Sequence, residues 1–442
     1  NAYREVCLLP EFQGRNAGNS ENQQNGGSSS VWALKSYFGR VNYNYQGKYL
    51  FEANARYDGS SRFATGNKYA FFPSFSAGWR ISEESFMAAT RDVITDMKFR
   101  ASWGRLGNQS IGTYPSSSAI SLGSTNYNFG NNLYTGAALT TMANSEIKWE
   151  TTTVTDIGID LNLWRNLTIT ADYFYRKTDD ILLQLDIPKA LGLSNPYQNA
   201  GVVENKGWDI AVAYRNVLGD LKYNIAVNLS DVKNNILDMK GVLRTGLTVN
   251  HEGNPIGSLY GYEALGYFQS DSEIASAAKQ FGVGAPGDIK YKDQNGDGVI
   301  NSADEVIIGS PIPRYSYSAN IGLEYKGFDL SIFLQGVGKA DGYLYNQGIF
   351  PFFQGGTAQE QHKDRWSADN QDASFPRLAF NGTNNIQNST FWMKNSAYLR
   401  LKNIGLGYTI PLTKIGSTTI NNLRVFVTGQ NLFTSTKFWK GF

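Results

Sequence analysis

The feature that most constrains the fold is a strict alternation of apolar and polar residues over segments of about ten residues. In the stretch YLFEANARYD, Tyr49, Phe51 and Tyr57 occupy one face, whereas Glu52 and Arg56 occupy the other. The same alternation runs through LTITADYFYRK, TDIGIDLNLW, WDIAVAY, YNIAVNLS, YSANIGLEY and FDLSIFLQ. Because successive side chains of a strand point to opposite faces, these segments predict β-strands with one apolar and one polar face. Two structures contain such strands: a soluble sandwich, and a membrane barrel with a polar lumen.

Segment length, aromatic placement and connection length favour the membrane barrel. A tilted strand of about 9–11 residues crosses a bilayer, and aromatic girdles mark its two interfaces. Aromatic residues recur near the predicted strand ends, as at Trp79, Trp164 and Tyr325. Short turns such as Lys326-Gly327 alternate with long links rich in Asn, Gly and Ser, which is the pattern of periplasmic turns and external loops. The long links are 107–147, 178–205, 231–312 and 338–395.

We therefore predict an all-β chain that forms a transmembrane antiparallel β-barrel in the outer membrane, in contact with its lipid. About twelve strands are expected. They lie near 33–45, 48–58, 70–81, 96–106, 148–163, 166–177, 206–216, 220–230, 313–325, 328–337, 396–410 and 421–432. The segment 82–95 is predicted to be a periplasmic turn that contains a short helix. The polar face, including Asp160, Asp172 and Arg176 with Glu52 and Arg56, is expected to line the lumen.

The direction of the strands adds an expectation about completeness. If the short turns are periplasmic, the first strand runs inward from outside and the last runs outward. A single-chain bacterial barrel starts and ends on the periplasmic side with an even number of strands. We therefore expect this chain to be a fragment of a larger barrel, because an open sheet edge in lipid leaves costly unsatisfied backbone groups.

Composition excludes several classes of function. Forty Lys and Arg nearly balance 38 Asp and Glu, so no strong charge favours nucleic acid as a partner. Cys7 is the single cysteine and cannot form an internal disulfide, while His251 and His362 are too far apart in sequence to indicate a zinc site or a catalytic triad. Adjacent carboxylates such as Asp179 and Asp180 do not demand glycoside hydrolysis. We expect no enzymatic activity.

The run DQNGDGVINSADE carries the spacing of a calcium-binding loop at 293–304. Oxygen side chains fall at positions one, three, five, nine and twelve, with a glycine at six and a backbone carbonyl ligand at seven. The predicted ligands are Asp293, Asn295, Asp297, Val299, Asn301 and Asp304. Asp replaces the usual Glu at position twelve. An acidic turn without an ion is the alternative interpretation.

This loop does not indicate a calcium sensor. A sensor needs helices on both sides that swing open, whereas the upstream flank GDIKYK is extended and SADEV allows only one helical turn. The loop lies within the predicted external link 231–312, where a weak millimolar-range site would be occupied. Calcium is therefore expected to act as a structural staple that makes this link rigid.

Six runs together resemble the C-terminal part of the SusC/RagA-like TonB-dependent transporters of Bacteroidota. They are YLFEANARYDGSSRF (49–63), FFPSFSAGWRISEESF (71–86), MKFRASWGRLGN (97–108), GDIKYKDQNGDGVINSADE (287–305), YLRLKNIGLGY (398–408) and RVFVTGQNLFT (424–434). The resemblance spans essentially the whole chain, in the family's order. It implies a barrel of about 22 strands with an N-terminal plug. The plug and the TonB box are absent from these 442 residues.

The resemblance also implies a function and partners. Such transporters import oligosaccharides or peptides, take energy from the TonB-ExbB-ExbD complex through the N-terminal part, and are capped outside by a SusD-like surface lipoprotein. Contacts with a glycan or peptide substrate are expected from the external segments IFPFFQGG and DRWSADNQ, because loops on a rigid scaffold carry recognition. The candidates are Phe350, Phe352, Phe353 and Trp366, although the same aromatics could simply pack the loops together.

Two other functions remain open from the sequence. One is a secreted glycan-degrading enzyme with a dockerin-like calcium loop, although a dockerin ordinarily has two such loops in a helical module and this chain has one, between strands. The other is a passive porin, which would share the strands but lack the plug and the lipoprotein.

Overall fold

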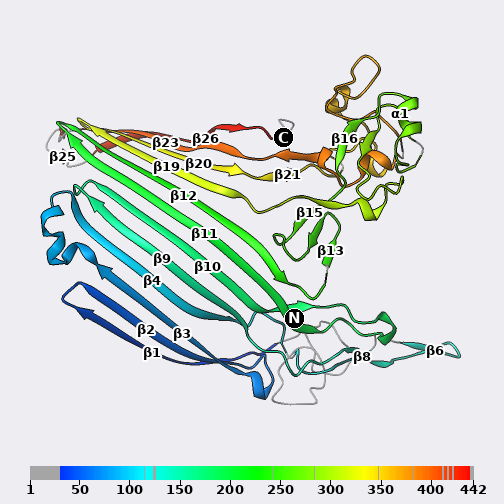
Figure 1. Ribbon diagram of the computed structural model, residues 1–442, viewed down its shortest axis with the longest axis horizontal. Helices are drawn as coiled ribbons and strands as arrows, with labels where there is room; N and C mark the ends of the chain where they lie inside the picture. The colour runs from blue at the N-terminus through cyan, green and yellow to red at the C-terminus, as the bar shows by residue number, and fades with distance from the viewer. Residues whose placement is uncertain are drawn as a thin grey trace.

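The computed structural model describes residues 30–438, apart from 114, 123–125, 242, 283, 347, 381, 411–412, 416–417 and 421–422. Its main element is a 12-stranded antiparallel sheet in which the strands follow one another in chain order (Figure 1). The strands are β1 (Leu34–Tyr45), β2 (Tyr49–Ser60), β3 (Tyr69–Arg80), β4 (Ile94–Asn108), β9 (Glu150–Leu163), β10 (Leu167–Gln184), β11 (Tyr197–Leu218), β12 (Leu221–Asp238), β19 (Arg314–Tyr325), β20 (Phe328–Lys339), β23 (Tyr398–Ile410) and β26 (Leu423–Thr436). The predicted all-β class and strand number are confirmed. Cys7 lies outside the described residues.

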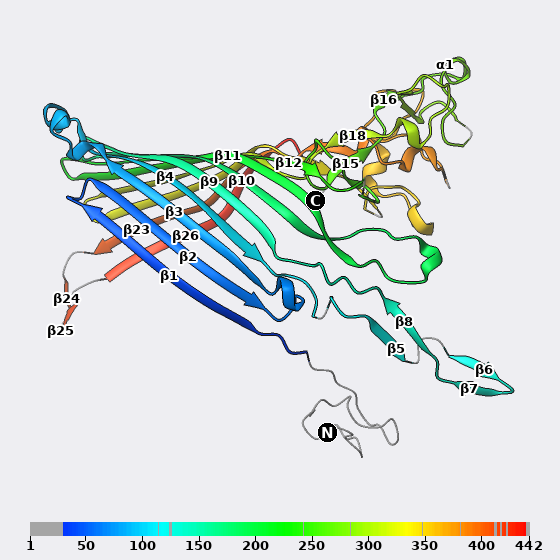
Figure 2. The ribbon, with the colours of Figure 1, turned by 60° about the horizontal axis from the view of Figure 1, so that its bottom comes forward.

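The sheet is curved into a trough, with β1 and β26 along its two rims (Figure 2). Its register places apolar side chains beside apolar ones and polar side chains beside polar ones, because residues paired across two strands share a face. Between β10 and β11, Tyr173 pairs with Trp208 on one face and Asp172 pairs with Asp209 on the other. The apolar side chains of the first face are exposed, for example Ile157 at 60% and Tyr173 at 53%. An apolar face of this extent requires a nonaqueous surrounding, as the alternation predicted.

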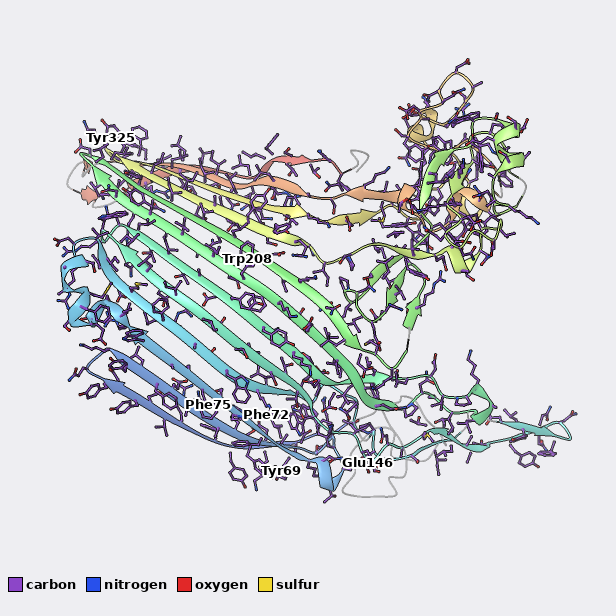
Figure 3. The ribbon with its side chains drawn as sticks, viewed as in Figure 1. Tyr69, Phe72, Phe75, Glu146, Trp208 and Tyr325 are labelled. Carbon is purple, nitrogen blue, oxygen red and sulfur yellow. The ribbon has the colours of Figure 1, made fainter. Side chains whose placement is uncertain are left out.

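The two ends of the sheet differ. Tyr325, beside a tight turn, marks one end, whereas Tyr69 and Glu146 lie at the other (Figure 3). We call these the short-turn end and the long-loop end. At the short-turn end, the link between β3 and β4 contains two 3-10 helices, η2 (Ile81–Glu83) and η3 (Ser85–Thr90). The predicted helix-containing turn at 82–95 is therefore confirmed in its helical character.

Three strands extend further at the long-loop end than the sequence predicted. β10 continues to Gln184, β11 begins at Tyr197, and β12 continues to Asp238, whereas the predicted boundaries were 177, 206 and 230. Val203 and Ile236 of these extensions form a small apolar core with Met239, the residue that follows β12. Apolar and polar residues alternate where a strand has one face in lipid and the other in water. The extensions pack against protein instead, and this is why the pattern missed them.

The long links also contain structure of their own. The link between β4 and β9 forms two hairpins that project from the sheet (Figure 2). The smaller strands are β5 (Ala119–Leu122), β6 (Tyr127–Phe129), β7 (Asn132–Tyr134), β8 (Ala137–Thr141), β13 (Leu243–Thr245), β14 (Thr248–Asn250), β15 (Ser258–Gly261), β16 (Ala264–Tyr267), β17 (Ile289–Tyr291), β18 (Val306–Gly309), β21 (Asp341–Tyr343), β22 (Met393–Asn395), β24 (Thr413–Ile415) and β25 (Thr418–Ile420).

Helices are short throughout the described ranges. The α-helix is α1 (Asp271–Ser276), and the remaining 3-10 helices are η1 (Thr65–Asn67), η4 (Lys189–Leu191), η5 (Ser302–Asp304), η6 (Phe353–Gly355), η7 (Glu360–Lys363), η8 (Asn384–Ile386) and η9 (Thr390–Trp392). In the part of the chain that the structure describes, no helix combines the length and the apolar character needed to cross a membrane.

Candidate functional site

The polar face of the sheet carries an ion-pair network centred on Arg100 of β4. Its guanidinium donates to Asp160 of β9 at 2.9 and 3.0 Å, and it lies 2.9 Å from a carboxylate oxygen of Asp172 on β10. Lys98 approaches Asp160 at 2.9 Å from the same side. The predicted wall residues Asp160 and Asp172 are thus brought together. Arg100, which joins them, was missed because alternation gives the face of a residue and not its cross-strand partner.

A glycine gives this network its shape. Gly158 lies opposite Asp172, and a Cβ atom at position 158 would lie 2.0 Å from a carboxylate oxygen of Asp172 and 2.9 Å from the guanidinium of Arg100. Because the glycine has no side chain, the Asp172 carboxylate can lie flat against the sheet.

The other predicted wall residues lie apart from this network. Arg56 pairs with Asp58 at 3.2 Å, and Glu52 lies 3.8 Å from Arg40. Arg176 borders a different hollow of the polar face, further along the sheet. The polar face is thus charged along its length, and part of this charge is paired, as between Arg56 and Asp58 and between Arg100 and Asp160.

At the long-loop end, two links that are separate in sequence pack into one body. We call it the two-loop unit, formed by residues 239–313 and 340–397, and it lies beyond the ends of β19, β20 and β23 (Figure 1). Its core is formed by buried side chains from both links. They are Tyr262, Ile289, Tyr291, Ile300, Leu344, Ile349, Phe350, Phe375 and Trp392. Burial raises the pKa of Tyr262 to about 12, which keeps this phenol neutral.

The buried carboxylate of Asp288 joins the two links. It accepts hydrogen bonds from the Arg377 guanidinium at 2.7 and 3.1 Å, and from the Asn385 side chain at 2.8 Å. Within its own link it accepts from the backbone N–H of Ala285 at 2.9 Å. Asn385 in turn accepts from the backbone N–H of Ile289 at 2.9 Å. A carboxylate with this many donors is well satisfied despite its burial, so the network fixes one link on the other.

The predicted calcium loop forms part of this unit. Asp293 accepts hydrogen bonds from the backbone N–H groups of Gly296 at 2.6 Å and Gly298 at 2.8 Å. Both glycines have positive φ, +76° and +82°, which glycine adopts without the strain of a side chain. Asn295 and Asp297 each accept from the N–H two residues further on, at 2.9 and 2.8 Å. The loop is thus closed by its own predicted ligands.

Its last predicted ligand, Asp304, is fully buried. The backbone N–H of Asn301 donates to its carboxylate at 2.8 Å and lowers its pKa, with further help from the N–H of Gln294 at 2.9 Å. The side chains of Asn295 and Asn301 approach Asp297 Oδ2 at 3.1 and 3.5 Å. These contacts are donated by the amide nitrogens, so Asn295 and Asn301 are neighbours of Asp297 but do not direct their oxygens to a shared centre.

The donors fit a hard cation in type and in order, with three carboxylates, two amides and the carbonyl of Val299. Across the described residues, no three His, Cys, Asp or Glu side chains are already gathered as metal ligands. Binding would therefore require the carboxylates to turn inward. The loop is preceded by β17, and it is followed by β18 after the short η5. The prediction that it lacks a pair of flanking helices that could open is therefore confirmed.

An aromatic cavity of about 330 Å³ opens in the same unit. Phe350, Phe352 and Phe353, three of the four predicted substrate contacts, line it. Phe350 belongs to the core and stacks edge-on against Trp392 at 4.9 Å, so it forms a rigid part of the wall. Trp366 does not line this cavity. Its indole N–H donates to Gln269 at 3.2 Å, and its ring covers Gly287.

Comparisons with known proteins agree with this architecture. Residues 3–432 match the family described as TonB dependent receptor-like, beta-barrel. The chain is 35% identical over 420 residues to TonB-dependent receptor P3 of Formosa agariphila, covering 92% of this chain and 41% of the relative. It is 29% identical over 420 residues to TonB-dependent receptor SusC of Bacteroides thetaiotaomicron, again covering 92% of this chain and 41% of the relative. The chain thus spans about two fifths of the length of these relatives.

A solved structure shows the same fold. The structure of the RagAB peptide transporter superposes with a TM-score of 0.78 at 23% identity, covering 96% of this chain and 46% of that chain. At this identity the likeness concerns the fold.

Proposed function

Because the chain belongs to the TonB-dependent receptor β-barrel family of outer-membrane proteins, we propose that it forms part of the barrel wall of a TonB-dependent importer. The observation that carries the proposal is the family match over residues 3–432, together with a curved sheet that has an apolar face and a charged face with ion pairs. The cargo would pass along the charged face after TonB acts on a plug that belongs to the N-terminal part of the full protein. Transport would be driven by the TonB-ExbB-ExbD complex.

The proposal also assigns an orientation and a partner. In this orientation the short-turn end is periplasmic and the long-loop end faces outside. A SusD-like surface lipoprotein would cover the long-loop end, as the resemblance in sequence implies. The projecting hairpins and the two-loop unit provide the surfaces that such a cap would contact. Copurification of the full-length protein with a surface lipoprotein tests this assignment, and a protein isolated alone under mild detergent extraction would contradict it.

Calcium is proposed as a structural ion of the two-loop unit. Asp293, Asn295, Asp297, Asn301 and Asp304, with the carbonyl of Val299, would hold it. The ion would supply a fixed positive charge and no reaction step. Its location supports a staple, because Ile300 within the loop belongs to the core of the unit, and Gly298 accepts a hydrogen bond from the backbone N–H of Lys279 at 2.8 Å.

The cargo is proposed to be an oligosaccharide or a peptide that meets aromatic side chains of the two-loop unit. Phe350, Phe352 and Phe353 offer their rings from one cavity, and Trp366 offers a separate contact on the same unit.

Uptake by cells that carry the full-length protein tests the importer. We expect a variant lacking its TonB-contacting segment to reach the outer membrane and to import no cargo. Unchanged uptake by that variant would indicate a passive porin. A full-length protein that is soluble without detergent and cleaves glycans would indicate the secreted enzyme instead.

A further inference from the structure

The walls of the cavity in the two-loop unit are mainly apolar. Eight of the thirteen residues that line it are apolar. The largest are Phe350, Phe352, Phe353, Pro376, Ile386 and Trp392. At about 330 Å³ it lies at the lower end of the size range of ligand sites, which begins at about 300 Å³. This volume suits one bulky group of a larger cargo.

Two of the four polar side chains on the wall are already bonded to a residue outside it. Arg377 and Asn385 line the cavity, and both bond to the carboxylate of Asp288. The remaining polar side chains, Gln354 and Thr383, are exposed and so lie towards solvent. A sugar ring in this cavity would bury hydroxyl groups, and each buried hydroxyl without a partner costs about 1–3 kcal/mol. An apolar side chain carries no such penalty, and a peptide backbone could meet the exposed hydroxyl group of Thr383 outside.

The rim of the cavity is held in an unusual backbone conformation. Phe352 and Gln354 both have positive φ, 59° and 50°, although neither is a glycine. Residues with side chains are rarely held there, and such strain gathers at ligand clamps. The Phe352 ring packs against Phe380 at 5.7 Å, and Phe380 is 68% exposed. The strained backbone thus holds the ring of Phe352, a residue that lines the cavity, against the exposed ring of Phe380.

We propose that this cavity is a specificity subsite that takes one large apolar side chain, aromatic or branched aliphatic, of a peptide cargo. This inference rests on the proposed import function and narrows its cargo class. The core ring pair of Phe350 and Trp392 forms the rigid wall, and Phe352, which packs against Phe380, contacts the bound side chain.

Equilibrium binding to the purified full-length protein tests the subsite separately from transport. The probes are a matched set of five-residue peptides, Gly-Gly-X-Gly-Gly with X as Phe, Leu, Ala or Asp, together with the free amino acid phenylalanine and a neutral gluco-oligosaccharide. We expect the Phe and Leu peptides to bind roughly 10- to 100-fold more tightly than the Ala peptide, the gain expected from burying one such side chain. The free amino acid should bind more weakly than the Phe peptide.

Two variants and a control make the assignment specific. Phe352→Ala removes one aromatic ring from the cavity lining, and Ile386→Trp fills the cavity without removing a lining side chain. Each should reduce the preference for Phe over Ala to less than threefold. Phe86→Ala, at the short-turn end where Phe86 is 65% exposed, should preserve that preference.

Three results would overturn the subsite. They are equal binding of all four peptides, tight oligosaccharide binding that is lost in Phe352→Ala, and binding of free phenylalanine as tightly as the peptide. The second would assign a glycan subsite, and the third a small-molecule site. If the full-length protein shows the predicted peptide selectivity but supports no TonB-dependent uptake, the proposed import function is refuted and the subsite is retained.

Discussion

Replacing Asp288 with alanine should separate the two links of the two-loop unit without disturbing the sheet. The Asp288 side chain is 3% exposed, and its carboxylate receives hydrogen bonds from Arg377, Asn385 and the backbone of Ala285. Arg377 and Asn385 come from the other link. The substitution thus leaves a guanidinium without its counter-charge and a buried amide without its acceptor.

The size of the destabilisation follows from how far the Asp288 and Arg377 side chains are exposed to water. Breaking a buried ion pair from one side costs about 3–5 kcal/mol. The Arg377 side chain is 31% exposed and can turn partly to water, which places the loss near the lower limit, at about 3 kcal/mol. Since about 1.4 kcal/mol corresponds to a factor of ten, the open state of the unit should become roughly 100-fold more populated.

Hydrogen exchange followed by mass spectrometry measures this population in the purified full-length protein. Peptides that contain the cross-link amides, such as Ile289 and Tyr262, should exchange roughly 100-fold faster in Asp288→Ala. Peptides from β10 to β12 should be unchanged. The control is Asp369→Ala, an exposed residue of the same unit, which should match the wild type. Exchange within threefold of wild type, or equal loss of protection in the sheet, would refute the role given to Asp288.

Three further predictions concern other parts of the chain. Calcium should slow amide exchange around the 293–304 loop by at least tenfold relative to chelator, and Asp297→Ala should abolish the difference; identical exchange with calcium and chelator would exclude the staple. Because hydrogen bonding depresses the pKa of Asp304, its stabilisation should be complete above the unfolded pKa of about 3.9 and be lost as the pH falls through the folded pKa. The protection factors of the loop amides, which correct for the pH dependence of intrinsic exchange, should therefore be flat from about pH 5 to 8 and fall below about pH 4. A loop already opening at pH 6 would contradict that assignment. Gly158→Val should collide with Asp172 and destabilise the sheet by about 1–3 kcal/mol in a melting experiment, whereas Gly39→Val, where a Cβ meets nothing within 4 Å, should melt like the wild type; equal melting of the two variants would show that the network tolerates the collision.

The sheet could be predicted from the sequence because the alternation of apolar and polar residues in each strand depends on what lies on its two faces. Residues such as Tyr173 and Asp172 fall on opposite faces by their positions alone. With a bilayer on one side and water on the other, apolar and polar residues therefore alternate with a period of two. The longer β11 and β12 could not be predicted, since Val203 and Ile236 contact protein beyond the bilayer and the period disappears.

The candidate site was only partly predictable, for a physical reason. The spacing of 293–304 is a local property, so its turns could be predicted directly, and its calcium ligands stay a prediction. The pairing of Asp288 with Arg377 joins residues far apart in sequence, and no local pattern specifies it. Phe352 was identified by its residue type, whereas its positive φ depends on the packed unit around it.

Cargo accumulation in intact cells that produce the full-length protein tests the central claim most directly. The measurement compares cells before and after a protonophore abolishes the energy supply of TonB, with a small solute that enters through passive porins as the internal control. The account predicts that cargo accumulation stops while entry of the small solute continues. Cargo entry that persists at the same rate without the energy supply would contradict it.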